Sequence, residues 1–329
     1  MAVQHDHLPT PVGRRIVVGV DGSAASLAGV EFIAALQLSA RDSIVVATIV
    51  EPPYLVGLGL GRASDRLFDE LSAAAHERGR TIAERAAERL IGLPCDVRTE
   101  VLMGHPVESL RRLATGRRAD LLVLGPHGRG QLGSLILGSV SQSLLGDMPT
   151  SMLIARPPTH RLTNVLLAID GSPQSLAAAE MLSSLPLPMG AVVSVCISMT
   201  PWTDEYADLP HADFLDLFRA EREHSESIAN RAIGLLGSVG SRATRTIRQG
   251  DPKREILGAA SDLGADLIVL GSRGLGGFKG LLLGSVSRGV AKAAPCSVLV
   301  VAPPHRGTRK ARPSGSPPSR SRHGEEGPQ

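Results

Sequence analysis

The chain has 329 residues, of which 43% are hydrophobic and 20% charged, and its formal net charge is +3. Aromatic residues make up only 2%, so its cores must be aliphatic, which favours helix-covered parallel sheets over an aromatic-rich β sandwich. Three widely spaced cysteines argue against a disulfide framework and against a zinc site. The sequence shows no signal-peptide core and no window near the roughly 18 apolar residues of a membrane span, so we expect a cytoplasmic protein of about two domains.

The basic character is concentrated at the C-terminus. Residues 304–329 contain six basic and two acidic residues, a net +4, and since the whole chain carries +3, the remainder carries −1. This segment is rich in Pro, Ser, Gly and Arg, which predicts a disordered basic tail, and residues 1–13 are expected to be flexible too. The tail is short and lacks aromatic residues, which argues against a nucleic-acid partner beyond weak, salt-sensitive contacts.

The first half of the chain alternates short apolar runs with amphipathic or charged segments. Buried strands joined by helical crossovers are typical of a parallel sheet. In chain order the pattern predicts a strand at 15–20, a helix at 24–38, a strand at 44–50, a helix at 64–90, a strand ending at 103, a helix at 107–115, a strand at 119–124, a helix at 139–145 and a strand at 149–155.

The second half repeats this order. An offset of 149 residues matches Asp21 to Asp170, and an offset of 146 matches Gly104 to Gly250, so the second copy has lost a net three residues in its middle. We therefore predict an α/β protein with two tandem doubly wound five-stranded parallel sheets. The predicted domains are 14–156 and 161–303, joined by the linker 157–160. In the second domain the expected strands are 164–169, 191–198, one ending at 249, 265–270 and 295–302, with helices at 176–185, 212–236, 253–261 and 285–292.

A glycine motif follows the fourth strand of each half. Its form is Gly-x-x-Gly, nine residues, then Gly-Ser, and its two copies begin 146 residues apart. A glycine-rich turn between a buried strand and a helix start is a common phosphate site, because backbone N–H groups and the helix dipole face the anion. The motif lacks the Gly-Lys-[Ser/Thr] of a P-loop and does not open the first helix as in dinucleotide-binding folds. Its copies comprise Gly125, Gly128, Gly138 and Ser139, and Gly271, Gly274, Gly284 and Ser285.

Two further matched positions have both a structural and a functional interpretation. Asp21 and Asp170 end the first strands, where Asp serves as a turn or N-cap residue, or as an acceptor for a base amino group or ribose hydroxyl. Gly104 and Gly250 each precede x-Pro at a helix start, which a tight turn with Pro in the first helical position explains. The same glycines would also lie beside a bound base, and the sequence leaves both interpretations open.

The two glycine motifs differ in sequence. His127 stands where the second copy has Arg273, so a catalytic base at His127 would make the two halves chemically different. Pro126 removes one backbone N–H from the first loop, which predicts weaker or different phosphate binding there. The Gly271 loop is therefore the expected tighter site.

Taken together, Val-Asp-Gly-Ser after the first strand, Gly-x-Pro, Ala-Asp-Leu-[Leu/Ile]-Val-Leu-Gly and the glycine motif resemble the universal stress protein family over residues 14–156 and 161–302. The resemblance implies the tandem, ATP-binding form. It implies base and ribose contacts from the two aspartates, backbone contacts from the second strands and the Gly-x-Pro turns, and phosphate contacts from the glycine motifs. The implied residues are Asp21, Ile49, Gly104, Gly125, Gly128, Gly138, Ser139 and Val140, with Asp170, Ile197, Gly250, Gly271, Gly274, Gly284, Ser285 and Val286.

The resemblance also implies that the two domains pair within one chain through their last strands, 151–155 and 297–302, and it leaves a further homodimer open. The expected ligand is ATP, with Mg²⁺ arriving on the nucleotide. The expected function is a nucleotide-dependent regulatory module in the stress response. The alternative is a slow ATPase or phosphotransferase, for which His127 or Asp251 would be the available base.

Overall fold

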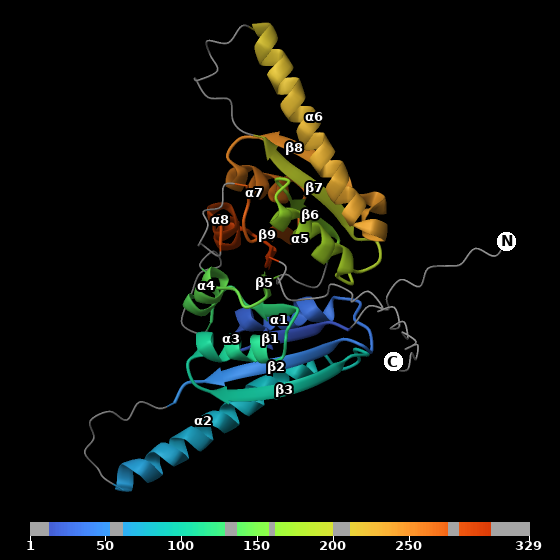
Figure 1. Cartoon of the computed structure of the whole chain (residues 1–329). Coiled ribbons are helices and arrows are strands. Elements are labelled where there is room, and N and C mark those ends of the chain that lie inside the picture. Colours follow the sequence, from blue (N-terminus) through green and yellow to red (C-terminus); the bar gives the residue numbers. More distant parts are fainter. Residues whose placement is uncertain are drawn as a thin grey trace, which may run out of the picture.

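The structure is a computed structural model that describes residues 13–52, 62–128, 137–157, 162–199, 211–275 and 283–303. Ten strands in this part of the chain form one continuous sheet, in the order β3-β2-β1-β4-β5-β10-β9-β6-β7-β8 (Figure 1). The strands are β1 Arg15–Gly19, β2 Ser43–Val50, β3 Asp96–Met103, β4 Leu121–Leu124, β5 Ser151–Ile154, β6 Asn164–Ala168, β7 Val192–Met199, β8 Thr244–Gln249, β9 Leu267–Gly271 and β10 Ser297–Val301.

Each repeat follows the predicted order of strands and helices, and neighbouring strands within a repeat are parallel. The predicted α/β fold is therefore confirmed. The helices are α1 Ala24–Ala34, α2 Arg62–Glu88, α3 Pro106–Gly116, α4 Ser139–Gly146, α5 Pro173–Ser184, α6 His211–Leu235, α7 Pro252–Asp262 and α8 Ser285–Ala293, with a short 3₁₀ helix η2 at Gly237–Arg242.

Local sequence explains where several helices begin. The hydroxyl of Ser23 caps α1 by accepting a hydrogen bond from the N–H of Ser26, and Ser172 caps α5 in the same way. Proline occupies the first turn of α3, α5 and α7, where a missing N–H costs no helical bond. The first helix ends at Ala34, four residues before the predicted end, because Leu36 and Leu38 turn inward and are buried instead.

The helices cover both faces of the sheet. Ala86 of α2 and Phe32 of α1 belong to the core on one face, which in the second repeat includes Leu182 of α5. The other face is covered by α3, α4, α7 and α8, with Leu144 and Val290 in its core. Each repeat is thus a doubly wound unit, as predicted. Figure 1 shows α2 and α6 extending past the outer strands at opposite ends of the molecule.

The two repeats meet through β5 and β10, which run antiparallel with Leu153 opposite Leu299. The strand residues at this junction are almost fully buried. Two matching hydrogen bonds flank the junction. Arg156 N donates to Ser297 Oγ at 3.0 Å, and Ala302 N donates to Ser151 Oγ at 3.2 Å. The expected intrachain pairing is confirmed, and it fuses the two five-stranded sheets into one.

Residues 1–12 of the predicted N-terminal segment, most of the linker 157–160 and the basic tail 304–329 lie outside the described residues. In the part of the chain that is described, no helix combines the length and the apolar character needed to cross a membrane.

Candidate functional site

The first repeat contains a cavity of about 380 Å³ at the carboxyl ends of β1, β2 and β4. This is the edge where open parallel sheets usually bind ligands. Of the predicted site residues, Asp21, Ile49, Gly125, Gly128, Gly138, Ser139 and Val140 line it, whereas Gly104 does not. Its other lining residues are Gly19, Val20, Ser26, Ala47, Pro106, Leu110, Leu124, His127 and Ser141.

The second repeat contains a larger cavity of about 540 Å³ in the matching place. The predicted residues Asp170, Gly271, Gly274, Gly284, Ser285 and Val286 line it, whereas Ile197 and Gly250 do not. Its other lining residues are Ala168, Ile169, Ser175, Cys196, Ser198, Pro252, Ile256, Leu270, Arg273, Leu275, Leu283 and Ser287. The cavities are hereafter the N-terminal cavity and the C-terminal cavity.

The first glycine of each motif lies against the helix that follows β1 or β6. A Cβ atom at Gly271 would stand 2.6 Å from the carbonyl carbon of Gln174 and 2.8 Å from the N atom of Ser175. A Cβ at Gly125 would collide with the carbonyl of Ala25 in the same way. Since both obstacles are backbone, only glycine fits, and the glycine loop is held close to the start of α1 or α5.

The second glycine lies against the aspartate. A Cβ at Gly128 would lie 2.6 Å from Asp21 Oδ2, and a Cβ at Gly274 would meet the matching oxygen of Asp170. The Asp170 carboxylate accepts a hydrogen bond from Leu275 N at 2.9 Å and another from Ser172 N at 3.0 Å. Asp170 therefore joins the glycine loop to the turn before α5 while it lines the cavity.

Helices α4 and α8 begin at the cavities without a side-chain cap. Their N-cap residues, Gly138 and Gly284, make no side-chain hydrogen bond to the first turn. The N–H groups at a helix start lack intrahelical partners and attract anions. Because Ser139 and Ser285 occupy the first helical position and line the cavities, each cavity has an uncapped helix start at one end.

Two buried serines outside the predicted set of site residues fix this geometry. Ser141 Oγ donates to Gly125 O at 2.8 Å, and Ser287 Oγ donates to Gly271 O at 2.7 Å. Each bond ties the helix that starts at the cavity to the first glycine of the motif. The recurrence of Gly-Ser-Val-Ser in both repeats was the sequence signal that could have identified them.

The structure changes the meaning of Pro126. At the matching position, the N–H of Ser272 donates to Val301 O at 2.9 Å, which extends the pairing of β9 with β10. The proline therefore removes a strand hydrogen bond, and β4 ends at Leu124 whereas β9 continues to Gly271. The loop itself closes alike, since Pro126 O accepts from Gly138 N at 2.6 Å and Ser272 O accepts from Gly284 N at 2.8 Å. The N–H that Pro126 lacks is therefore a strand donor and not a loop donor, so the reason given for weaker phosphate binding at the first loop was wrong.

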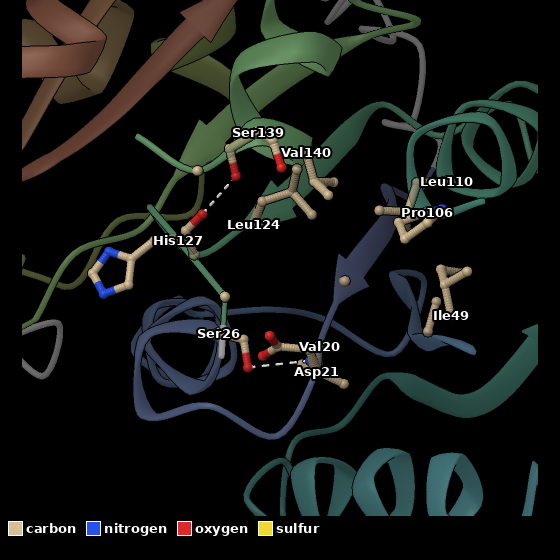
Figure 2. A pocket seen from close by; sticks show the side chains of 16 residues that line it. Val20, Asp21, Ser26, Ile49, Pro106, Leu110, Leu124, His127, Ser139 and Val140 are labelled. Carbon is tan, nitrogen blue, oxygen red and sulfur yellow. Dashed lines mark hydrogen bonds between the residues drawn. The ribbon is translucent and has the colours of Figure 1, made fainter. Parts of the chain in front are cut away.

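The end of the N-terminal cavity away from the glycine loop is apolar. Figure 2 shows Ile49, Pro106 and Leu110 together on the side opposite His127 and Ser139, with Asp21 between the two ends. In the C-terminal cavity, Pro252 and Ile256 take the places of Pro106 and Leu110. Each cavity therefore has an apolar end, a carboxylate and an uncapped helix start in that order.

The side chain of Ile197 does not line the C-terminal cavity, and the backbone contact expected there stays a prediction. Adjacent residues of a strand face opposite sides of the sheet, and Ile197 belongs to the core of the face that α5 and α6 cover. Its neighbours Cys196 and Ser198 line the cavity, and Ser198 is the true match of Ile49. Gly104 and Gly250 have φ values of +141° and +149°, so the turn before the helix requires glycine there whether or not a ligand binds.

The C-terminal cavity contains further polar groups. Burial raises the pKa of the Cys196 thiol to about 11, so the thiol stays protonated near neutral pH. Arg273 lines this cavity and its Nε is buried with no hydrogen-bond partner among the described residues; His127 Nδ1 at the matching position is likewise unpartnered. The two cavities thus share the glycine loop, the aspartate and the helix start, and they differ in the charge and polarity of their other lining residues.

The model of the universal stress protein family matches residues 13–156 and 162–302. The chain belongs to the universal stress protein family. A universal stress protein of Mycobacterium tuberculosis is 30% identical over 309 residues, covering 87% of this chain and 94% of that protein. Both matches therefore support a tandem universal stress protein.

A solved structure with a similar chain length supports the fold. A universal stress protein from Archaeoglobus fulgidus has a TM-score of 0.61 at 20% identity, covering 88% of this chain and 98% of the other. A universal stress protein in complex with cAMP is 26% identical, with a TM-score of 0.31, and covers 44% of this chain and 98% of its own.

Proposed function

We propose that this universal stress protein binds one adenine nucleotide, ATP in the first place, in each of its two cavities and acts as a nucleotide-dependent regulatory module. The observation that carries the proposal is the order of groups along each cavity, from an uncapped helix start, past a carboxylate, to an apolar wall. A nucleotide has the same order, from anionic phosphates, past ribose hydroxyls, to a flat apolar base.

The phosphates would lie at the starts of α4 and α8, where Ser139 and Ser285 present N–H groups and hydroxyls. In the C-terminal cavity, Arg273 would add a positive charge near them. Asp21 and Asp170 would accept hydrogen bonds from the ribose, and the base would pack between the second strand and Pro106 or Pro252. Each cavity has an uncapped helix start, a carboxylate and an apolar wall, so we propose two nucleotide sites per chain.

We propose that the protein binds ATP and does not hydrolyse it efficiently. Among the described residues, no group of three or more His, Cys, Asp and Glu side chains is placed to hold a metal ion, so any Mg²⁺ would arrive on the nucleotide phosphates. Phosphate release from ATP tests this directly. We expect release well below the roughly 1 per second of a typical enzyme, and a faster rate that His127→Ala abolishes would favour the ATPase alternative.

Nucleotide binding can be tested by substitutions that place a carboxylate where the phosphates are expected. Ser139 and Ser285 are exposed at helix starts, where an added aspartate is favourable for the helix but repels an anion. We expect nucleotide-stripped protein to bind two ATP per chain by calorimetry, and Ser139→Asp and Ser285→Asp each to bind one. Ser143→Asp, an exposed site later in α4, is the charge-matched control and should bind two. No ATP binding by the unsubstituted protein would overturn the proposal.

A further inference from the structure

The two cavities differ at the strand residue facing the apolar end. Ser198 of β7 lines the C-terminal cavity, and its Oγ donates a hydrogen bond to Gly250 O at 2.9 Å. The hydroxyl proton is thereby committed to the Gly250 carbonyl. The oxygen lone pairs remain, and they make Ser198 an acceptor for a donor group in the cavity.

The matching residue in the N-terminal cavity is Ile49, and strand register establishes the match. Val50 of β2 pairs with Met103 of β3, and Met199 of β7 pairs with Gln249 of β8. In the first repeat, Val50 directly follows Ile49, and its partner Met103 directly precedes Gly104. In the second repeat, Met199 directly follows Ser198, and its partner Gln249 directly precedes Gly250. Ile49 thus faces the N-terminal cavity where Ser198 faces the C-terminal one, and its side chain offers only apolar contact.

The part of a purine that reaches this wall follows from the proposed function, on which this inference rests. With phosphates at the helix start and ribose at the aspartate, the base extends toward the second strand. The six-membered ring is the part of a purine furthest from the ribose, so the substituent at position 6 lies at that end. In adenine this substituent is an amino donor, and in hypoxanthine and guanine it is an oxygen acceptor.

We propose that Ser198 makes the C-terminal cavity selective for 6-aminopurine nucleotides over 6-oxopurine nucleotides, whereas the N-terminal cavity lacks this selection. The adenine amino group donates to Ser198 Oγ while Ser198 continues to donate to Gly250. A 6-oxo group presents a second acceptor to the same oxygen, and Ser198 can serve it only by giving up the Gly250 carbonyl. The cavities are therefore unequal in the bases they accept.

Single-site variants make the test specific. Ser139→Asp leaves only the C-terminal cavity available, and affinities for ATP and ITP, which differ at position 6, are measured by calorimetry. We expect Ser198→Ala in this background to lower the ratio of ATP affinity to ITP affinity about fivefold, the effect of one ordinary hydrogen bond. In the Ser285→Asp background, which leaves the N-terminal cavity, Ile49→Ser should raise the same ratio.

Ser194→Ala is the matched control, because Ser194 lies on the same strand and its hydroxyl bonds Thr244 at 2.9 Å without lining the cavity. It should leave the ratio unchanged, which separates base selection from a general weakening of β7. A ratio that changes less than twofold in Ser198→Ala while ATP still binds would overturn this inference and leave the proposed function intact. Absence of ATP binding in both single-site backgrounds would overturn both.

Discussion

The buried guanidinium of Arg156 donates a hydrogen bond to the carbonyl oxygen of Ala291, 2.7 Å away, across the boundary between the two repeats. Its other terminal nitrogen faces Cys296 O at 3.5 Å. Ala291 lies in the last turn of α8, where unsatisfied carbonyls and the helix dipole favour a cation. The matching residue in the second repeat is Ala302, so this contact runs one way, from the first repeat to the second.

Replacing Arg156 by methionine should lower the free energy of unfolding by about 1–3 kcal/mol, because the α8 carbonyls lose their donors in a buried setting. Burial lowers the pKa of Arg156, yet the group remains charged at any working pH. Urea unfolding measures the change. Arg89→Met removes an exposed pair with Glu31 and should cost less than about 1 kcal/mol. Equal losses in the two variants would contradict the importance of the buried contact.

The glycines of the second motif should respond differently to alanine. Gly271→Ala drives a Cβ into the backbone of α5 and should destabilise the fold by about 1–3 kcal/mol. Gly274→Ala meets only the Asp170 side chain, so it should weaken ATP binding at the C-terminal cavity more than it lowers the melting temperature. Gly116→Ala is the control, since nothing lies within 4 Å of its Cβ. Thermal unfolding and ATP titration together distinguish these outcomes, and a normal Gly271→Ala melting temperature would refute the packing argument.

Ser287→Ala should weaken ATP binding at the C-terminal cavity and lower stability by about 1–2 kcal/mol, because it leaves the buried Gly271 carbonyl without the hydroxyl that holds α8 to the glycine loop. Ser141→Ala should act in the same way on the N-terminal cavity. Calorimetry in the two single-site backgrounds measures each effect. If each substitution weakened both cavities equally, the serines would act on the fold rather than on their own loops.

Asp42 should make the protein sensitive to acid. Burial raises its pKa, but hydrogen bonds from Ser39 and Arg14 outweigh burial and hold the pKa below its ordinary value. A carboxylate with a lowered folded-state pKa contributes stability above its unfolded pKa of about 3.9, and that contribution is lost as the pH falls through the folded value. We expect Asp42→Asn to flatten the fall in stability below about pH 4, and Ser39→Ala to flatten it less. Unfolding curves at several pH values measure this, and an unchanged slope in Asp42→Asn would be inconsistent with the assignment.

Much of the architecture was predictable from the repeated order of apolar runs. Short strands without alternation must be buried on both faces, and the two copies matched along the chain, so the ten strands were expected, whereas the β5–β10 pairing was expected only from the resemblance to the universal stress protein family. The end of α1 was less certain, because Leu36 and Leu38 continue the apolar pattern but pack as a loop. Helical periodicity does not distinguish these two ways of burying a leucine.

The cavities were predictable in place but not in detail. Glycine spacing located the loops, yet it did not reveal that the N–H lost at Pro126 belonged to a strand ladder. The match of Ile49 to Ile197 was one residue off, because the offset of 149 residues holds through the second strands and gives Ser198. In a strand, an error of one residue reverses the face on which a side chain lies.

The central claim is that each chain has two nucleotide cavities. Equilibrium dialysis of nucleotide-free protein against labelled ATP tests it most directly, because it counts bound ligand without assuming a signal. We expect binding to saturate at two ATP per chain. Saturation at one ATP per chain would contradict the claim that both cavities bind nucleotide, and no saturable binding would contradict the nucleotide assignment altogether.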